Sequence, residues 1–340
     1  MSGITNTNRI DVVNIGLLLF SCLLAFIIPF ELFLFAYGVL GPLHYLTEIS
    51  WLHDKNYFTT DKRDVILLVV VSLILTIVNL KVYIPIVKEL DFGESKAVYT
   101  FLNQIIFIAF GSSLFFALIK KRIYKIVGVL IIILMSLVVE NFAVIFSVFL
   151  PTLIHVFLFT WLFMLYGSLK TKSKMGYLSV VLLAIIPFIL FYAFPNKQFV
   201  PISEYGRSTY GPFEQLNMEI LKLFGVQFHS IDNVKTEVFN SRLGLAIMRF
   251  IAFAYTYHYL NWFSKTKVIG WHDIPRSRAI FIVLLWIVSL VLYGIDYSLG
   301  FKWLFLLSFM HVMLEFPLNY ISFVGIFKAL TGSGVKAVSK

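Results

Sequence analysis

The sequence has one cysteine and few charged residues. Cys22 alone cannot form an intrachain disulfide or a cysteine-ligated metal cluster, so both are excluded. Only 14% of the 340 residues are charged and 59% are apolar, whereas soluble domains average about 25% and about 45–50%. The 36 Phe and 17 Tyr residues cannot all be hidden in one aqueous core. This composition, with a mean hydropathy of +0.88, excludes a water-soluble globular protein and indicates that lipid is the solvent.

Several enzyme motifs are also missing. The chain has no Walker loop, no Gly-x-Gly-x-x-Gly opening a helix, no Gly-x-Ser-x-Gly elbow and no His-Glu-x-x-His zinc motif. The paired His-x-x-His-His boxes of membrane fatty-acid desaturases and hydroxylases are absent as well. A functional interpretation must therefore rest on residue chemistry and on topology.

Basic residues exceed acidic ones, with 28 Lys and Arg against 18 Asp and Glu and a formal net charge of +10. In a soluble protein this excess would suggest a nucleic-acid partner. Here the basic residues lie in short loops between apolar runs, which is the pattern of membrane orientation and not of a phosphate-binding surface. We therefore expect membrane lipids as partners, and no nucleic acid.

About ten apolar runs are long enough to cross a bilayer, because a spanning helix needs roughly 20 residues. They cover 12–29, 31–52, 64–84, 97–119, 123–139, 142–168, 176–194, 243–263, 278–298 and 302–327. The least certain division is near Glu140 and Asn141, where two runs could form one bent segment. We predict an all-α fold, a polytopic helical bundle in which residues 1–340 form a single transmembrane domain.

The distribution of Lys and Arg orients this bundle. With a cytoplasmic N-terminus, eighteen of the 28 basic residues lie in inside segments and nine outside, and Arg249 lies within a span. Both termini are therefore predicted to be cytoplasmic, which agrees with an even number of helices. The first run lacks a small-residue cleavage site, so we expect a retained helix. The chain is then a multi-pass integral membrane protein, in the plasma or inner membrane if its source is bacterial.

One sizeable segment lies outside the apolar runs, at 195–242, on the predicted extracytoplasmic side. Gly206, Gly211 and Pro212 mark turns within it. The stretch from Glu214 to Val226 mixes apolar and charged positions, and we predict that it forms a short helix on the membrane surface.

Two expected spans carry the same His-x-x-x-Glu spacing. His44 precedes Glu48 in the second span, and His311 precedes Glu315 in the last. Residues four apart share one helix face, so each helix projects an imidazole and a carboxylate in one direction. An ionisable group within a span is costly, and its default interpretation is functional. Imidazole and carboxylate without thiolate form the ligand set of non-haem iron, manganese or zinc.

Further ligands could come from other histidines on the same side of the membrane. His258 lies in the eighth span and is flanked by Tyr257, while His53 and His272 each precede an aspartate, Asp54 and Asp273. We expect these residues to be additional ligands or to fix imidazole tautomers. The alternative for each buried histidine is a hydrogen bond between helices, and for the surface histidines it is a head-group contact.

Two other polar residues lie within expected spans. His155 follows Pro151 by four residues. It either hydrogen-bonds to the carbonyl that the proline leaves without a donor or lines a substrate cavity. Arg249 must snorkel or pair with an acid, for which Glu140 and Asp296 are the candidates.

We predict a metalloenzyme with a cytoplasmic-side His/Glu centre, namely a non-haem iron oxidoreductase or oxygenase, mononuclear or di-iron. Its substrate would be lipid-soluble, such as an acyl chain, isoprenoid or carotenoid, and its electrons would come from a donor protein. The expected metal ligands are His44, Glu48, His53, His258, His272, Asp273, His311 and Glu315, and the catalytic candidates are Glu48, Tyr257 and His155.

The same residues leave three alternatives open. A zinc-dependent membrane hydrolase or transferase would use the same ligands. A proton-coupled secondary transporter would use intramembrane His and Glu as a relay, and a faint echo of His44-Tyr45-Leu46 in His258-Tyr259-Leu260 would be its internal repeat. A b-type haem protein would use two of the buried histidines as axial ligands.

Overall fold

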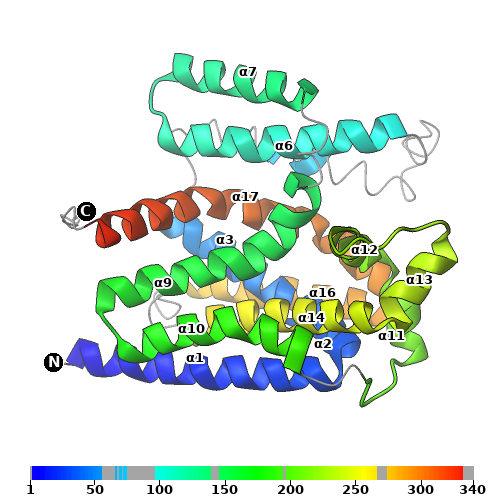
Figure 1. Ribbon diagram of the computed structural model, residues 1–340. Helices are drawn as coiled ribbons and strands as arrows, with labels where there is room; N and C mark the ends of the chain where they lie inside the picture. The colour runs from blue at the N-terminus through cyan, green and yellow to red at the C-terminus, as the bar shows by residue number, and fades with distance from the viewer. Residues whose placement is uncertain are drawn as a thin grey trace. The chain divides into compact units, whose positions relative to one another are not determined.

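The computed structural model describes residues 2–55, 66, 69–70, 72–74, 96–138, 145–193, 197–265 and 274–331. Throughout these ranges the regular structure is helical, and no strand occurs (Figure 1). The all-α prediction is therefore confirmed for the described part of the chain. The chain divides into two compact units, which are described separately; the single transmembrane domain stays a prediction.

Unit 1 consists of Met1–Gly41, Val156–Pro275 and Ile321–Lys340. Its long helices are α1, α10 and α14, and α10 and α14 each pack against α1. Its elements are α1 (Ser2–Ile27), α2 (Pro29–Phe35), η1 (Ala36–Leu40), α9 (Thr160–Thr171), α10 (Lys174–Phe188), η3 (Ile189–Ala193), α11 (Glu204–Thr209), η4 (Gly211–Phe213), α12 (Glu214–Leu223), α13 (Ile231–Asn240) and α14 (Arg242–Ser264).

Unit 2 consists of Pro42–His155 and Arg276–Tyr320. The helices α6 and α7 form an antiparallel hairpin within it (Figure 1). The Phe110 ring of α6 lies 5.4 Å from Phe309 and 5.9 Å from Phe316, so this hairpin packs against the last helix of the chain. The elements are α3 (Gly41–Lys55), α6 (Lys96–Leu118), α7 (Arg122–Val138), η2 (Ile145–Phe159), α16 (Arg276–Ile295) and α17 (Tyr297–Leu330), with unit boundaries inside α3, η2 and α17.

Six helical segments in the described residues are long and apolar enough to cross a membrane. They are Arg9–Ile27, Pro29–Asp54, Val148–Thr171, Lys174–Ala193, Arg276–Ile295 and Tyr297–Leu330, and each overlaps a predicted span. Helices α6, α7 and α14 lie where three more spans were predicted, at 97–119, 123–139 and 243–263. Most of 64–84, and the division near Glu140, fall outside the described residues. The number of ten spans and the cytoplasmic termini stay predictions.

Prolines and hydroxyl caps set several helix ends. Helix α1 ends before Ile28, whose φ of −133° is not helical, and Pro29 begins α2 at the first helical position, where no N–H is needed. Helix α9 ends at Lys172, which adopts a left-handed φ of 53°. The Ser173 hydroxyl then accepts a hydrogen bond from the N–H of Gly176 at 3.1 Å and caps α10.

Three segments, η1, η2 and η3, have π-helical geometry, which is rare and occurs frequently at functional sites. The longest is η2, which contains Pro151. Because proline has no N–H, the regular ladder of backbone hydrogen bonds is interrupted there. The hydroxyl of Thr152 donates to the carbonyl of Val148, so a side chain next to the proline adds a hydrogen bond to the backbone beside this break.

Arg249 lies in the middle of unit 1 and is fully buried. Its Nε donates to the carbonyl of Phe26 at 3.2 Å, and its Nη2 donates to the carbonyl of Lys197 at 2.9 Å. The guanidinium also lies 4.3 Å above the Phe26 ring. It therefore caps the C-terminal end of α1, where the helix dipole favours a cation. Of the two expected acidic partners, Glu140 lies outside the described residues, and Asp296 caps α17 by accepting from the N–H of Leu299 at 2.8 Å.

The segment 195–242 is folded where it is described. Helix α12 lies where the sequence predicted a helix from Glu214, and α11, η4 and α13 accompany it. The Tyr210 hydroxyl donates to Asn217 at 2.6 Å, and the Tyr210 ring packs edge-on against Phe30 of α2. These contacts join the segment to unit 1. Its position on the outer surface of the membrane stays a prediction.

The close approach of α13 and α14 depends on Gly244. A Cβ atom at this position would lie 2.0 Å from the carbonyl oxygen of Glu237 and 2.7 Å from that of Val238. Backbone atoms cannot move aside as side chains can, so only glycine fits there.

We expect Gly244→Ala to destabilise the protein by about 1–3 kcal/mol, because the added methyl group overpacks a backbone contact. Gly16→Ala in α1 is the matched control, since a Cβ there meets nothing within 4 Å. The measurement is the thermal unfolding midpoint, Tm, of each variant in detergent. Equal Tm values for the two variants would contradict the packing role of Gly244.

Candidate metal centre

Five ionisable side chains gather inside unit 2. They are the three imidazoles and two carboxylates of His44, Glu48, His155, His311 and Glu315, called the His/Glu cluster below. All five are buried, and they come from three elements, α3, η2 and α17. The two His-x-x-x-Glu pairs singled out in the sequence therefore both belong to one group, and His155 joins it from η2.

Helix α3 contributes His44 and Glu48. Their four-residue spacing places them on one helix face, and His44 Nε2 lies 3.0 Å from Glu48 Oε2. This contact does not have the geometry of a hydrogen bond at Oε2. Thr47, between them, points its hydroxyl back to the carbonyl of His44 at 3.0 Å.

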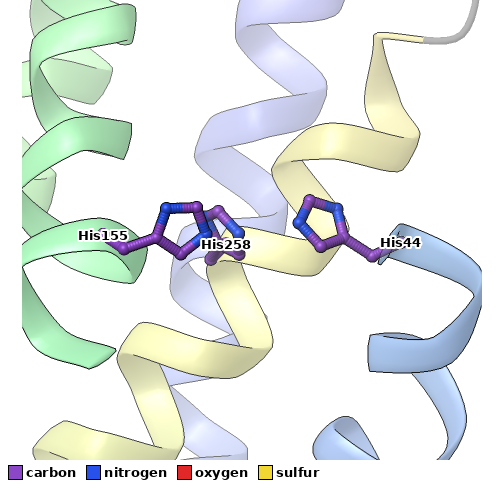
Figure 2. A group of neighbouring side chains, drawn as sticks. All are labelled: His44, His155 and His258. Carbon is purple, nitrogen blue, oxygen red and sulfur yellow. The ribbon is translucent and has the colours of Figure 1, made fainter. Parts of the chain in front are cut away.

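The π-helix η2 contributes His155. Its Nδ1 lies 2.7 Å from Oε2 of Glu315, and its Nε2 lies 3.1 Å from Nε2 of His311. A ligand nitrogen of His155 also lies within 4.8 Å of one of His44. Figure 2 shows the His44 and His155 imidazoles extending from their helices toward one another. The His155 ring thus contacts side chains of the cluster. The residue that hydrogen-bonds to the backbone near Pro151 is Thr152, through the carbonyl of Val148.

Helix α17 contributes His311 and Glu315. The His311 ring stacks on Tyr45, with ring centroids 4.3 Å apart and an interplanar angle of 28°. It meets the rings of His44 and His155 edge-on, at 5.4 and 4.9 Å. His311 is therefore the central ring of the cluster, and the flat Tyr45 ring restricts its orientation.

The separations within the cluster suit a bound metal ion. Ligand atoms of His44, Glu48 and His311 all lie within 4.8 Å of one another. Two nitrogens bound about 2.0–2.1 Å from one metal stand about 3 Å apart when they are adjacent ligands. Two histidines and one carboxylate form the facial triad that binds non-haem iron and leaves positions open for other ligands. The His44, Glu48 and His311 side chains supply that set.

The charges in the cluster also favour a cation. Among the described residues, no lysine or arginine lies within ion-pair distance of Glu48 or Glu315. A buried carboxylate without a cationic partner costs several kcal/mol, on the order of the desolvation penalty of an ion. Two carboxylates can be neutralised by one divalent cation or by proton uptake. The first option gives a metal centre and the second a proton-carrying group.

Two of the predicted site residues lie in unit 1. His258 Nδ1 is 2.7 Å from the hydroxyl of Thr160, and the Tyr257 hydroxyl is 3.2 Å from the sulfur of Met164. Both side chains are buried. Their partners within unit 1 fit the alternative of contacts between helices, and their roles as ligand and catalytic residue stay predictions.

The predicted surface residues do not join the cluster. His53 is 70% exposed and lies 3.5 Å from Asp54, and Asp54 accepts from the guanidinium of Arg278. This group links α3 to α16 at the surface of unit 2. His272 and Asp273 lie outside the described residues, and their role as ligands stays a prediction.

Two contacts in the cluster could not be predicted from the sequence. The contact between His155 and Glu315 joins residues 160 positions apart, and the stacking of Tyr45 on His311 joins residues 266 apart. Tyr45 is adjacent to a predicted ligand, but its ring could equally have belonged to an interfacial aromatic belt. His155 was predicted as a catalytic candidate, but its contact with Glu315 was not predicted, since spacing along one helix does not indicate a partner on another.

We expect Glu48→Gln and Glu315→Gln to affect metal binding differently. Glu48→Gln removes a ligand and should abolish binding, whereas Glu315→Gln removes a carboxylate behind His155 and should weaken affinity about 10–100-fold. Metal content after equilibrium dialysis against Fe(II), Co(II) or Zn(II) measures both, with the exposed His53→Ala as control. If the two glutamine variants lose metal to the same extent, Glu315 is itself a ligand. If Glu48→Gln binds as tightly as the wild type, the triad is not the site.

Compared with known proteins, the chain matches no family model, no curated protein and no solved structure. The function proposed below is argued from the geometry of the His/Glu cluster.

Proposed function

We propose that the protein is an integral membrane metalloenzyme, a non-haem iron oxidoreductase that acts on a lipid-soluble substrate. The observation that carries the proposal is the buried set of His44, Glu48 and His311, with ligand atoms within 4.8 Å of one another. Neutral imidazole and carboxylate suit iron, and zinc and manganese are the other candidates. The chain's single cysteine, Cys22, supplies no thiolate to the set.

A membrane location is supported by the helices themselves. Six described segments have the length and apolar character of spans. Helix α16 exposes a row of large apolar side chains, including Ile280, Phe281 and Leu284. Such a surface is stable when lipid covers it. We propose that the chain crosses the membrane several times, with the cluster at the depth of the acyl chains.

The surroundings of the cluster select the substrate. Apolar side chains of α17, such as Val312 and Leu314, are buried beside the ligands. An apolar site surrounded by lipid favours a substrate that diffuses to it laterally through the membrane, such as an acyl chain, isoprenoid or carotenoid. Glu48, His44 and His311 would hold the metal on one side and leave open positions on the other.

The bound metal would supply activation of dioxygen. Insertion of one oxygen atom into a C–H bond gives an alcohol, and the other oxygen atom leaves as water after taking up two electrons and two protons. An electron-donor protein would supply the electrons. His155 contacts His311 and is itself contacted by Glu315, so these two residues would hold the His311 ring in place.

Of the alternatives, the b-type haem protein is the least compatible with the cluster. Two axial histidines must leave room for a porphyrin between them. The imidazoles of His155 and His311 are already in contact, with 3.1 Å between their Nε2 atoms.

A zinc hydrolase or transferase would use the same triad, and a proton-coupled transporter would use the same two carboxylates as proton carriers.

The test is the metal content of protein purified in detergent without chelator, compared with the His44→Ala, His311→Ala double variant. We expect about one iron per wild-type chain and none in the double variant, because two of three ligands are removed. Nitric oxide added to the reduced wild-type protein should give an EPR signal only if the iron has an open position.

Three outcomes would contradict the proposal in different ways. Zinc in place of iron would indicate a hydrolase or transferase. A wild-type protein without metal that moves protons in liposomes would indicate a transporter. In the third outcome the protein binds iron, but the lipids of cells that express it do not differ in oxygen or hydrogen content from those of cells that express Glu48→Gln. That result would exclude the oxidoreductase.

A further inference from the structure

Helix α17 carries one more polar residue on the face of the His/Glu cluster. Asn319 follows Glu315 by four residues and His311 by eight. Residues at this spacing lie above one another on one side of a helix. The side chains of His311, Glu315 and Asn319 therefore form a line, about 6 Å apart along the axis at each step.

Asn319 is buried although the residues beside it are not. It is 4% exposed, whereas Leu318 is half-buried and Tyr320 is exposed. The inward side of α17 at this level is therefore the side of Asn319. The cluster and this amide lie on the same side of the same helix.

The amide nitrogen of Asn319 has no partner among the described residues. This nitrogen, Nδ2, is buried. A buried donor without an acceptor is unfavourable, and each such group in a native protein needs an explanation. A ligand oxygen placed at this donor would remove the cost.

We propose that Asn319 binds an acceptor oxygen at the polar end of the substrate. This inference rests on the proposed function, because the reacting part of the substrate would lie at the metal. Two helical turns, about 12 Å along the axis, separate Asn319 from His311. The substrate would then be a long apolar chain with a carboxylate or ester carbonyl at one end, and the reacting carbon would lie well along the chain. Pure hydrocarbons and carotenes would lack the group that Asn319 recognises.

The test is binding of three brominated probes to protein in nanodiscs, measured by saturable quenching of tryptophan fluorescence. The probes are dibromostearic acid, its methyl ester and dibromooctadecane, which lacks oxygen. We expect the acid and the ester to bind wild type about tenfold more tightly than the hydrocarbon, since only these two probes offer an acceptor oxygen to the buried donor of Asn319. Preference for the acid over the ester would identify a carboxylate as the ligand, and equal affinity would identify the carbonyl.

Two substitutions test the residue itself. Asn319→Leu removes the donor and fills the position with an apolar side chain. The isosteric Asn319→Asp replaces the donor with an acceptor. Both should reduce acid and ester affinity about tenfold and leave hydrocarbon affinity unchanged. Asn240→Leu, at the exposed end of α13, is the control and should bind as wild type. Equal affinity of wild type for all three probes, or unchanged acid affinity in both Asn319 variants, would overturn the proposal.

Metal content separates this inference from the proposed function. The Asn319 variants should keep the wild-type metal, because Asn319 is not a ligand. Wild-type protein that selects the acid through Asn319 but binds no metal would refute the metalloenzyme and leave a lipid-binding site. Protein that binds metal but does not distinguish the probes would refute the role of Asn319 alone.

Discussion

Two carboxylates buried beside three imidazoles impose the main constraint on unit 2. Glu48 and Glu315 come from different helices, and each has an imidazole nitrogen within 3.0 Å. A charge at this depth is tolerated only with compensating groups in contact. Helices α3, η2 and α17 must therefore meet at one level, and the packing of Phe110 against Phe309 and Phe316 supports α17 there. The arrangement of unit 2 follows from the need to gather these groups.

Unit 1 handles its buried charge differently. Arg249 is surrounded by backbone carbonyls and an aromatic ring, and its donors reach the end of α1 and the loop at Lys197. A guanidinium with fixed donors suits several carbonyls at once. Arg249 joins segments that are far apart in the sequence, and its positive charge lies at the negative end of the α1 helix dipole. A buried ionisable residue in this chain thus has a structural use in one unit and a proposed chemical use in the other.

The sequence predicted helices well where apolar runs were long, because length and hydropathy are local properties. It also identified both His-x-x-x-Glu pairs, since the four-residue spacing fixes a shared face. Spacing along one helix does not choose the partner across the bundle, so the contact of Glu315 with His155 required the structure. Asn319 was overlooked although it continues the spacing of His311 and Glu315, because an uncharged amide draws less attention than an ionisable group. Helix α14 contains three tyrosines and is almost wholly buried, so the apolar run there did not indicate which residues are exposed.

Because η2 is a π-helix, the orientation of His155 depends on how many residues precede it within η2. In an α-helix each residue turns the chain by about 100°, and a π-turn accommodates one residue more than an α-turn. Deleting one residue between Phe149 and His155 would therefore rotate the imidazole away from Glu315. Insertions and deletions at this point act on the cluster as strongly as substitutions, although they alter no side chain in it. The π-helical geometry of η2 therefore sets the direction in which the His155 imidazole points.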